Sequence, residues 1–254
     1  MKPQARKALV ALGVFAFWIA LWFLASGLVG KELLLPSPAQ VVRRFCLLAS
    51  GADFWITICH SLFRILTGLV AATVLGVLLA VLTEWSALLK ALFSPVLTLV
   101  KSTPVASFII LALVWLGRST VPVFISGLMV LPVVWSNVSA GIAARDPLLL
   151  ELAQVYGFPR SRVFRRITVP TVLPYFRSAL TSALGLGWKA GIAAEVLTVP
   201  QRSIGKMIYE SKLYLESTSL FAWTLTVILL SLLIERILLK FVRQIGVRGG
   251  VGRA

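Results

Sequence analysis

Long uninterrupted runs of apolar residues dominate the pattern of hydrophobic and polar positions along this chain. A helix that crosses a bilayer needs roughly 20 apolar residues, whereas a transmembrane β-strand would alternate apolar and polar residues. Because the runs are continuous, the pattern predicts an all-α fold, a polytopic membrane helix bundle with six transmembrane helices. These predicted spans cover about residues 8–29, 58–83, 91–116, 120–140, 178–198 and 218–239.

Prolines mark where these runs should break. Pro95 and Pro104 interrupt the third predicted span, and Pro36 and Pro38 lie in LPSPAQVVRRF, between the first two spans. Since proline breaks a helix, this segment predicts a loop followed by a short amphipathic helix. The apolar run after MKPQARK is too long for a typical signal peptide and lacks a good cleavage site, so we expect an uncleaved first span.

The composition supports a membrane protein. Of the 254 residues, 59% are hydrophobic and 13% are charged, whereas about 25% of the residues of a soluble domain are charged. So little charge cannot cover a soluble surface. The net charge of +16 does not indicate nucleic acid binding, because no basic stretch lies on a soluble module with interleaved aromatic residues.

The basic residues indicate an orientation in the membrane. If the N-terminus is cytoplasmic, fifteen Lys and Arg residues lie in cytoplasmic segments and eight in outer segments, with Lys101 and Lys189 inside spans. Cytoplasmic loops carry the excess of positive charge. The distribution therefore predicts that both termini are cytoplasmic (N-in and C-in), and that the polar segment 141–177 is cytoplasmic as well.

This cytoplasmic segment contains ELAQVYGFPRSRVFRRITVP, residues 151–170. Asp146 and Pro147 stand where a helix N-cap and first helical residue belong, and Gly157 can end the helix. One face of this short helix is apolar, formed by Leu148, Leu149, Leu152, Val155 and Tyr156. A plain orienting loop would explain the arginines but not this spacing. The segment predicts a helix, a turn and a second helix that can dock in a groove of another protein.

The same segment resembles the cytoplasmic signature E-A-A-x3-G-x9-I-x-L-P of permease subunits of ATP-binding-cassette (ABC) importers. The matching residues are Glu151, Ala153, Gly157, Ile167 and Pro170. Leu152 and Val169 depart from the signature, which puts individual contacts in doubt. The segments LPSPAQVV, SLFRILTGLVAATVLGVLLA and GWKAGIAAEVL resemble the nitrate/sulfonate/taurine-type branch, so the resemblance covers about residues 30–240.

The resemblance implies a type I (MetI-like) permease fold in a single domain, 1–254, with a core of about 57–240 and a coupling segment of about 141–177. In that family the coupling helix lies in a cleft of a cytoplasmic ATPase. The resemblance also implies an extracytoplasmic solute-binding protein as partner, a homodimer of permeases, and a multi-pass location in a bacterial inner membrane in contact with lipid.

Several kinds of chemistry are not expected of this chain. It lacks a G-x-x-x-x-G-K-[ST] phosphate-binding loop, and the nearest fragment, SIGKM, lacks both the first Gly and the Ser/Thr. We therefore expect no enzyme activity and no cofactor, with ATP hydrolysed by a separate subunit. His60 is the only histidine, so no metal site is predicted. Whether Cys46 and Cys59 pair stays open.

Polar residues within the spans are candidates for the translocation path, because charges in a bilayer usually face a cavity or a partner. Lys101, Ser102 and Thr103 precede the helix break at Pro104, and Lys189 and Glu195 lie in the fifth span. Lys101 could instead extend to the cytoplasmic surface, and Glu195 could be a structural hydrogen-bonding group or part of an outer gate. Two lysines favour an anionic solute. Gly185, Gly187 and Gly191 are expected to permit close helix packing.

Two other classes of protein compete with an importer permease. An ion-gradient-driven secondary transporter would show paired internal repeats and buried acidic residues, but the nine acidic residues lie mostly in loops or at span ends. A membrane-embedded enzyme would need catalytic groups clustered within the spans. Co-purification with a soluble ATPase would distinguish the permease from both.

Overall fold

The computed structural model describes residues 3–247, all of whose regular elements are helices. In chain order these are α1 (Pro3–Val29), α2 (Pro38–Ala49), α3 (Ala52–Trp85), α4 (Ala87–Ser102), α5 (Val105–Trp115), α6 (Val121–Ala143), α7 (Pro147–Val155), α8 (Arg160–Val163), η1 (Phe164–Thr168), α9 (Val169–Thr198), α10 (Ile204–Leu213) and α11 (Ser217–Val247). The predicted all-α fold is confirmed. Lys2 and the basic tail from residue 248, both counted in the charge balance, lie outside the described residues.

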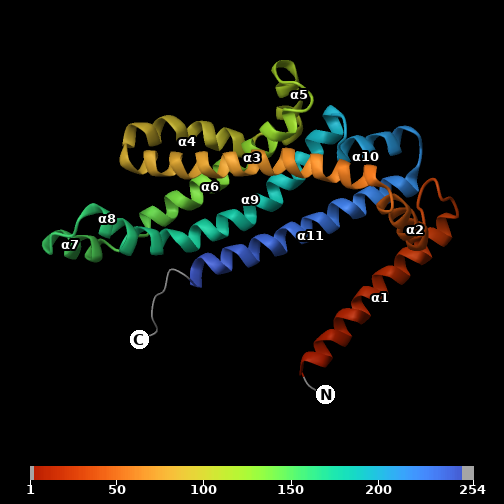
Figure 1. Cartoon of the computed structure of the whole chain (residues 1–254), viewed down its shortest axis with the longest axis horizontal. Helices are drawn as coiled ribbons and strands as arrows, with labels where there is room; N and C mark the ends of the chain where they lie inside the picture. Colours follow the sequence, from red (N-terminus) through yellow and green to blue (C-terminus); the bar gives the residue numbers. More distant parts are fainter. Residues whose placement is uncertain (1–2, 248–254) are drawn as a thin grey trace.

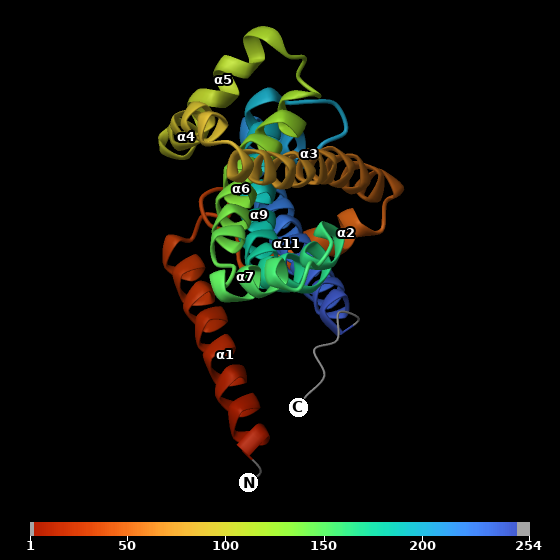
Figure 2. The same cartoon turned by 90° about the vertical axis from the view of Figure 1, so that its left-hand side faces the viewer.

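Helix α6 forms the centre of the bundle, packed along α3 on one side and α9 on the other. Figure 1 shows α6 and α9 running side by side with α3 across them, α11 alongside α9, and α10 at the end of α9 away from α7. Figure 2 shows α1 projecting away from this bundle. The main core cluster joins α3, α6 and α9 through residues such as Leu69, Val130, Val134 and Ala183.

Small residues allow the three central helices to approach closely. A Cβ added at Gly187 would lie 2.7 Å from Val130 Cγ2, and one added at Gly191 would lie 2.7 Å from Ile65 Cγ1. The expectation of close packing is therefore confirmed at these two glycines. It is wrong at Gly185, where nothing lies within 4 Å of an added Cβ, because this residue lies away from the α6 contact.

The predicted spans match the helices unequally. Four helices (within α1, α3, α6 and α11) are long and apolar enough to cross a membrane, and α4 with α5 is a bent pair that makes a fifth candidate. Helix α9 is not among them, and it carries Lys189 and Glu195 within the predicted fifth span. Six spans and the N-in, C-in orientation therefore remain predictions.

The third predicted span is broken rather than straight. The chain bends by 110° between α4 and α5, at Thr103 and Pro104. Pro95, the other expected interruption, lies inside the continuous helix α4. The expectation of a break was therefore right at Pro104 and wrong at Pro95. A helix can continue through a proline when neighbouring groups satisfy the backbone carbonyl that the proline leaves without a donor.

The predicted short amphipathic helix after the first span is α2. The Ser37 side chain and the Gln40 side chain cap its first turn reciprocally, which satisfies backbone donors that the helix leaves free. Cys46 on α2 and Cys59 on α3 are both free and exposed.

Candidate functional site

The predicted docking helix is α7. Asp146 caps it by accepting a hydrogen bond from the Leu148 backbone N–H at 2.9 Å, and Pro147 is its first residue. At the other end Gly157 has a φ of +61°. The Gly157 N–H donates to the Gln154 carbonyl at 3.0 Å, and the Phe158 N–H to the Ala153 carbonyl at 2.8 Å. These two bonds form a Schellman motif, which requires a left-handed residue at this position.

The apolar face of α7 is not covered by the other described residues. Leu148, Leu152 and Val155 are exposed, with 67%, 51% and 82% of their surface accessible, and Glu151 is exposed beside them. Ala153 is buried instead, at 3%. The structure thus separates the signature residues of this helix: Glu151 is exposed, while Ala153 is buried.

A π-helical turn, η1, joins this segment to α9. The Val169 N–H donates to the carbonyl of Phe164, five residues earlier, where an α-helix would bond to the fourth. Pro170 and Pro174 have no N–H to continue the usual ladder. The Thr171 hydroxyl donates to the Ile167 carbonyl at 2.8 Å, which satisfies one acceptor. Ile167 and Pro170 of the signature therefore lie at an irregular joint between the coupling segment and α9.

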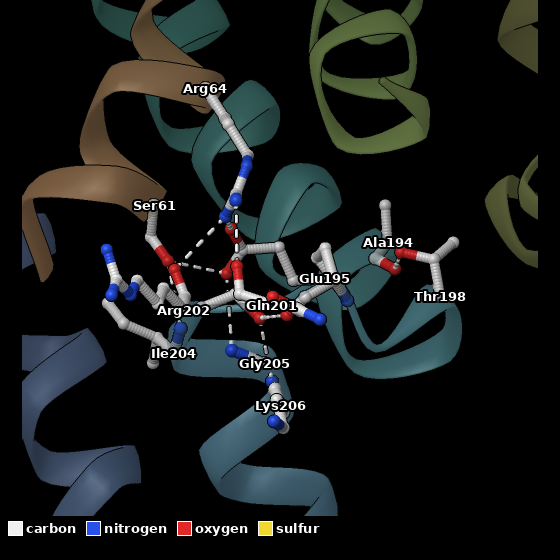
Figure 3. A network of polar contacts seen from close by, with 12 residues as sticks. Ser61, Arg64, Ala194, Glu195, Thr198, Gln201, Arg202, Ile204, Gly205 and Lys206 are labelled. Atoms are coloured by element: carbon white, nitrogen blue, oxygen red, sulfur yellow. Dashed lines mark hydrogen bonds and ion pairs between the residues drawn. The ribbon is translucent and has the colours of Figure 1, made fainter. Parts of the chain in front are cut away.

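Glu195 is the centre of a buried polar network at the opposite end of α9 (Figure 3). Its side chain is fully buried. Oε2 accepts hydrogen bonds from the Ser61 hydroxyl at 2.7 Å and from the Gly205 backbone N–H at 3.2 Å. Arg64 Nη1 lies 3.5 Å from Oε1. A buried carboxylate is costly unless it is paired and hydrogen-bonded. Here residues from α3 and α10 hydrogen-bond to Oε2, whereas Oε1 has the Arg64 ion pair but no hydrogen bond among the described residues.

Arg64 also holds the loop between α9 and α10. Its Nη2 donates to the Gln201 carbonyl at 2.8 Å, and its Nη1 donates to the Arg202 carbonyl at 3.2 Å. The Ser61 hydroxyl accepts from the Ile204 N–H at 2.9 Å. Val199 and Arg202 have φ values of +49° and +50°, so this loop is a tightly constrained turn. The network fastens α3, α9 and α10 together.

The ion pair between Arg64 and Glu195 was not predicted from the sequence. Opposite charges at the same predicted depth in two spans were the available signal. Among the described residues, Glu195 forms no ion pair with Lys189. The two residues point in directions roughly 120° apart on α9.

Lys189 lies on an exposed stripe of α9. This stripe runs the length of the helix and includes Tyr175, Ser178, Ser182, Leu186, Lys189 and Leu197. Its polar members occur on a helix whose other faces are covered by α3, α6 and α11. A stripe of this kind can face a second protein or an aqueous path.

Lys101 lies in the last turn of α4, just before the bend, and is exposed. The hydroxyls of Ser102 and Thr103 donate to the Leu99 carbonyl at 3.1 Å and 2.8 Å. The Leu99 carbonyl also accepts the Thr103 backbone N–H at 3.1 Å, so the two hydroxyls reinforce the last helical bond before the bend. Among the described residues, neither Lys101 nor Lys189 forms an ion pair.

Comparison with known proteins identifies relatives along most of the chain. Residues 72–247 match the family model of the binding-protein-dependent transport system inner membrane component. The taurine transport system permease protein TauC of Escherichia coli is 24% identical over 240 residues, covering 92% of this chain and 87% of TauC. The nitrate import permease protein NrtB of Synechococcus elongatus is 24% identical over 220 residues, covering 82% and 78%.

A solved structure shares the fold. A chain of the bacterial alginate ABC transporter, determined in complex with an alginate pentasaccharide-bound periplasmic protein, superposes with a TM-score of 0.60. The match covers 96% of each chain at 18% sequence identity. The helical arrangement of the bundle is therefore one already seen in ABC importer permeases.

Proposed function

Because the chain belongs to the family of binding-protein-dependent transport system inner membrane components, we propose that it forms the path by which a small solute enters the cell. In this proposal a separate cytoplasmic ATPase supplies the energy. The chain crosses the membrane six times with both termini in the cytoplasm, α9 being the span that α3, α6 and α11 surround. It is an inner membrane ABC importer permease of the nitrate/sulfonate/taurine-type branch.

The observation that carries the coupling role is the exposed apolar face of α7. Leu148, Leu152 and Val155 leave apolar area in water, and burying such area is the dominant favourable term in most protein association. Glu151 lies beside this face and contributes a charge for the partner. The ATPase is therefore the proposed cover for α7, with Ala153 and the Schellman turn at Gly157 holding the helix in place.

Helix α9 connects this surface to the outer end of the bundle. Its 30 residues rise about 1.5 Å each, which gives a rod of about 45 Å. The proposed coupling surface joins one end through η1, where Ile167 and Pro170 lie, and the Glu195 network holds the other end. A displacement of α7 would be transmitted to the outer side along the single helix α9. The angle between the coupling segment and α9 would change at the π turn.

The proposed path follows the exposed stripe of α9 and the bend after α4. Lys189 and Lys101 supply positive charge there, while Ser102 and Thr103 shape the bend and Glu195 fixes the outer end of the stripe. Two lysines and few acidic groups favour an anionic solute. The names of TauC and NrtB, transporters of taurine and nitrate, support a small anion or sulfonate of this kind.

Two further partners complete the proposed assembly. A solute-binding protein would dock on the outer side, as the alginate transporter binds a periplasmic protein. A second copy of the chain would close the path against the α9 stripe. Most soluble homo-oligomers are symmetric about a twofold axis, and the same symmetry here would bring two Lys189 side chains to opposite walls of one path.

Co-purification tests the coupling role. We expect the wild-type chain to retain its ATPase through affinity purification in detergent, and Glu151→Ala combined with Leu152→Ser to lose most of it. Glu210→Ala, a carboxylate change on α10 at the other end of the bundle, is the matched control and should retain the ATPase. Uptake that continues in cells without any ATPase would favour an ion-gradient-driven transporter and overturn the proposal.

A further inference from the structure

A groove of about 690 Å³ lies between the coupling segment and the adjoining ends of α3 and α6. Figure 1 shows α7 and α8 beyond the end of α6, on the side where α3 turns into α4. A second cavity of about 230 Å³ continues it into the bundle between α3, α6, η1 and α9. The two share Val81, Ile142, Phe164 and Thr168 as walls, so they form one groove. We call the part beside the coupling segment the basic part and the part between α3, α6, η1 and α9 the apolar part.

The walls of the apolar part include Val77 of α3, Val138 of α6, and Val172 and Phe176 of α9. Apart from the hydroxyl of Thr168, no side chain that lines it among the described residues carries a polar atom. Water finds no hydrogen-bond partner on such a wall, whereas each CH₂ group of a hydrocarbon chain is favoured there because it leaves water. The chemistry of this part fits an acyl chain.

The basic part has polar and basic side chains at its rim, beside an otherwise mostly apolar wall. Arg145, Arg160, Gln154 and Ser161 line it together with Glu84. Arg145 Nε donates to the Ile142 carbonyl at 2.8 Å, which fixes the guanidinium at the rim with its two terminal nitrogens free to bind a ligand. Lys90 Nζ lies 2.9 Å from Glu84 Oε1 and neutralises the one acidic group. The rim therefore attracts an anion, and guanidinium groups bind phosphate well.

We propose that this groove binds one anionic diacyl phospholipid, with its phosphate at Arg145 and Arg160 and one acyl chain along the apolar part. An apolar channel that ends in a basic rim at the edge of a helix bundle matches both halves of such a lipid. A second protein chain would have to insert an apolar side chain between α3, α6 and α9. Such a side chain would not account for the two arginines at the rim. Placing the lipid in the cytoplasmic leaflet rests on the proposed function. Its binding to the groove does not.

The lipid would contact the coupling segment directly. Ala153 of α7 and Phe164 of η1 both line the groove, and Phe164 accepts the backbone bond that defines the π turn. A lipid in this position fills the space behind α7 and supports its seat on the bundle. The groove thus links membrane composition to the joint between α7 and α9.

Native mass spectrometry of the purified full-length chain tests the proposal. The probes are phosphatidylglycerol and phosphatidylcholine with identical palmitoyl and oleoyl chains, titrated into the same detergent. We expect one phosphatidylglycerol to bind several-fold more tightly than phosphatidylcholine. Arg145→Gln combined with Arg160→Gln should weaken it by roughly fivefold for each arginine, since a basic residue near a lipid surface contributes about 1 kcal/mol.

Two controls make the test specific. Arg165→Gln combined with Arg166→Gln removes the same charge from η1, which is part of the same basic segment, but neither arginine lines the groove. This pair should leave the affinity within twofold. Dihexanoyl phosphatidylglycerol should bind more weakly than the long-chain lipid, and inorganic phosphate should not compete.

Four results would overturn the proposal: equal affinity for the two headgroups, equal loss in the two arginine pairs, short-chain lipid as tight as long-chain lipid, or displacement by phosphate. If dimerisation of the chain excluded lipid from the groove, phosphatidylglycerol and phosphatidylcholine would show equal affinity. ATPase co-purification is measured separately, so failure of the coupling role and failure of lipid binding can be told apart.

Discussion

Glu195 shows how single residues determine the end of this bundle that lies opposite α7. Its carboxylate is fully buried, beside an Arg64 side chain that is 14% exposed. Removing one partner of a buried ion pair leaves an uncompensated charge and typically costs 3–5 kcal/mol. Arg64 also bonds the carbonyls of Gln201 and Arg202, so the pair positions a loop as well as two helices. We therefore assign Glu195 first to the framework of the bundle, and to an outer gate only through the loop it holds.

Gly205→Ala tests how tightly this network is packed. A Cβ at Gly205 would overlap the Cβ and backbone carbonyl carbon of Glu195 and the backbone nitrogen of Val196. Backbone atoms cannot move aside easily, so we expect a loss of about 1–3 kcal/mol, seen as a lower midpoint of thermal unfolding in detergent. Gly185→Ala is the matched control, since nothing lies within 4 Å of its Cβ. An unchanged midpoint for Gly205→Ala would show that α9 and α10 are not held this closely.

Among the elements, α9 carries most of the functional argument. It begins at the π turn after the coupling segment, forms one wall of the core with α6, and ends at the Glu195 network. Its exposed stripe holds Lys189. The irregular start of α9 matters because it contains two prolines and a backbone hydrogen bond between residues five apart. These make it the weakest point in an otherwise continuous series of helical hydrogen bonds. Motion of α7 would concentrate there.

Gly157→Ala tests the Schellman turn that ends α7. The φ of +61° costs an L-residue roughly 1–2 kcal/mol, while open space around the Cβ position rules out a steric clash. We expect reduced co-purification of the ATPase with an unchanged unfolding midpoint of the bundle. Gly157→Asn should retain more of the ATPase than Gly157→Ala, because asparagine adopts this conformation more readily. Equal loss in both variants would argue that the turn geometry is not what matters.

At the scale of the whole molecule, large apolar and polar surfaces remain uncovered. None of the most apolar window of α1 is buried in the chain, and α1 is held to the rest mainly near its end, where Trp22 Nε1 donates to the Pro36 carbonyl at 3.1 Å. The exposed residues of α3 from Val70 to Leu82 are all apolar, as suits lipid, whereas the α9 stripe is mixed. Lipid covers the first kind of surface, and the second needs water or protein.

Lys189→Met tests whether the stripe lines a path for an anion. We expect uptake of the transported anion (taurine, nitrate or ethanesulfonate as probes) to fall by roughly fivefold in proteoliposomes, because one charge near an anion is worth about 1 kcal/mol. Lys189→Arg should keep most of the uptake. Lys212→Met, an exposed lysine on α10, is the control. Normal uptake by Lys189→Met would exclude this residue from the path.

The sequence by itself determined the class of the protein and the outline of its coupling segment. Continuous apolar runs predict helices because a bilayer offers backbone groups no other partners. The cap at Asp146, the turn at Gly157 and the break at Pro104 follow from local backbone chemistry, so they could be predicted from a few neighbouring residues. The family resemblance rests on the spacing of residues from Glu151 to Pro170, which is likewise a pattern of residues close together in the chain.

Only the tertiary structure decided what depends on residues far apart in the chain. It paired Glu195 with Arg64 and Ser61, separated buried Ala153 from exposed Glu151, and showed which glycines lie at helix contacts. It also showed that α3 and α10 supply the ion pair and the hydrogen bonds of the buried carboxylate on α9. These features arise where three helices meet, and no local pattern specifies which faces those helices present to one another.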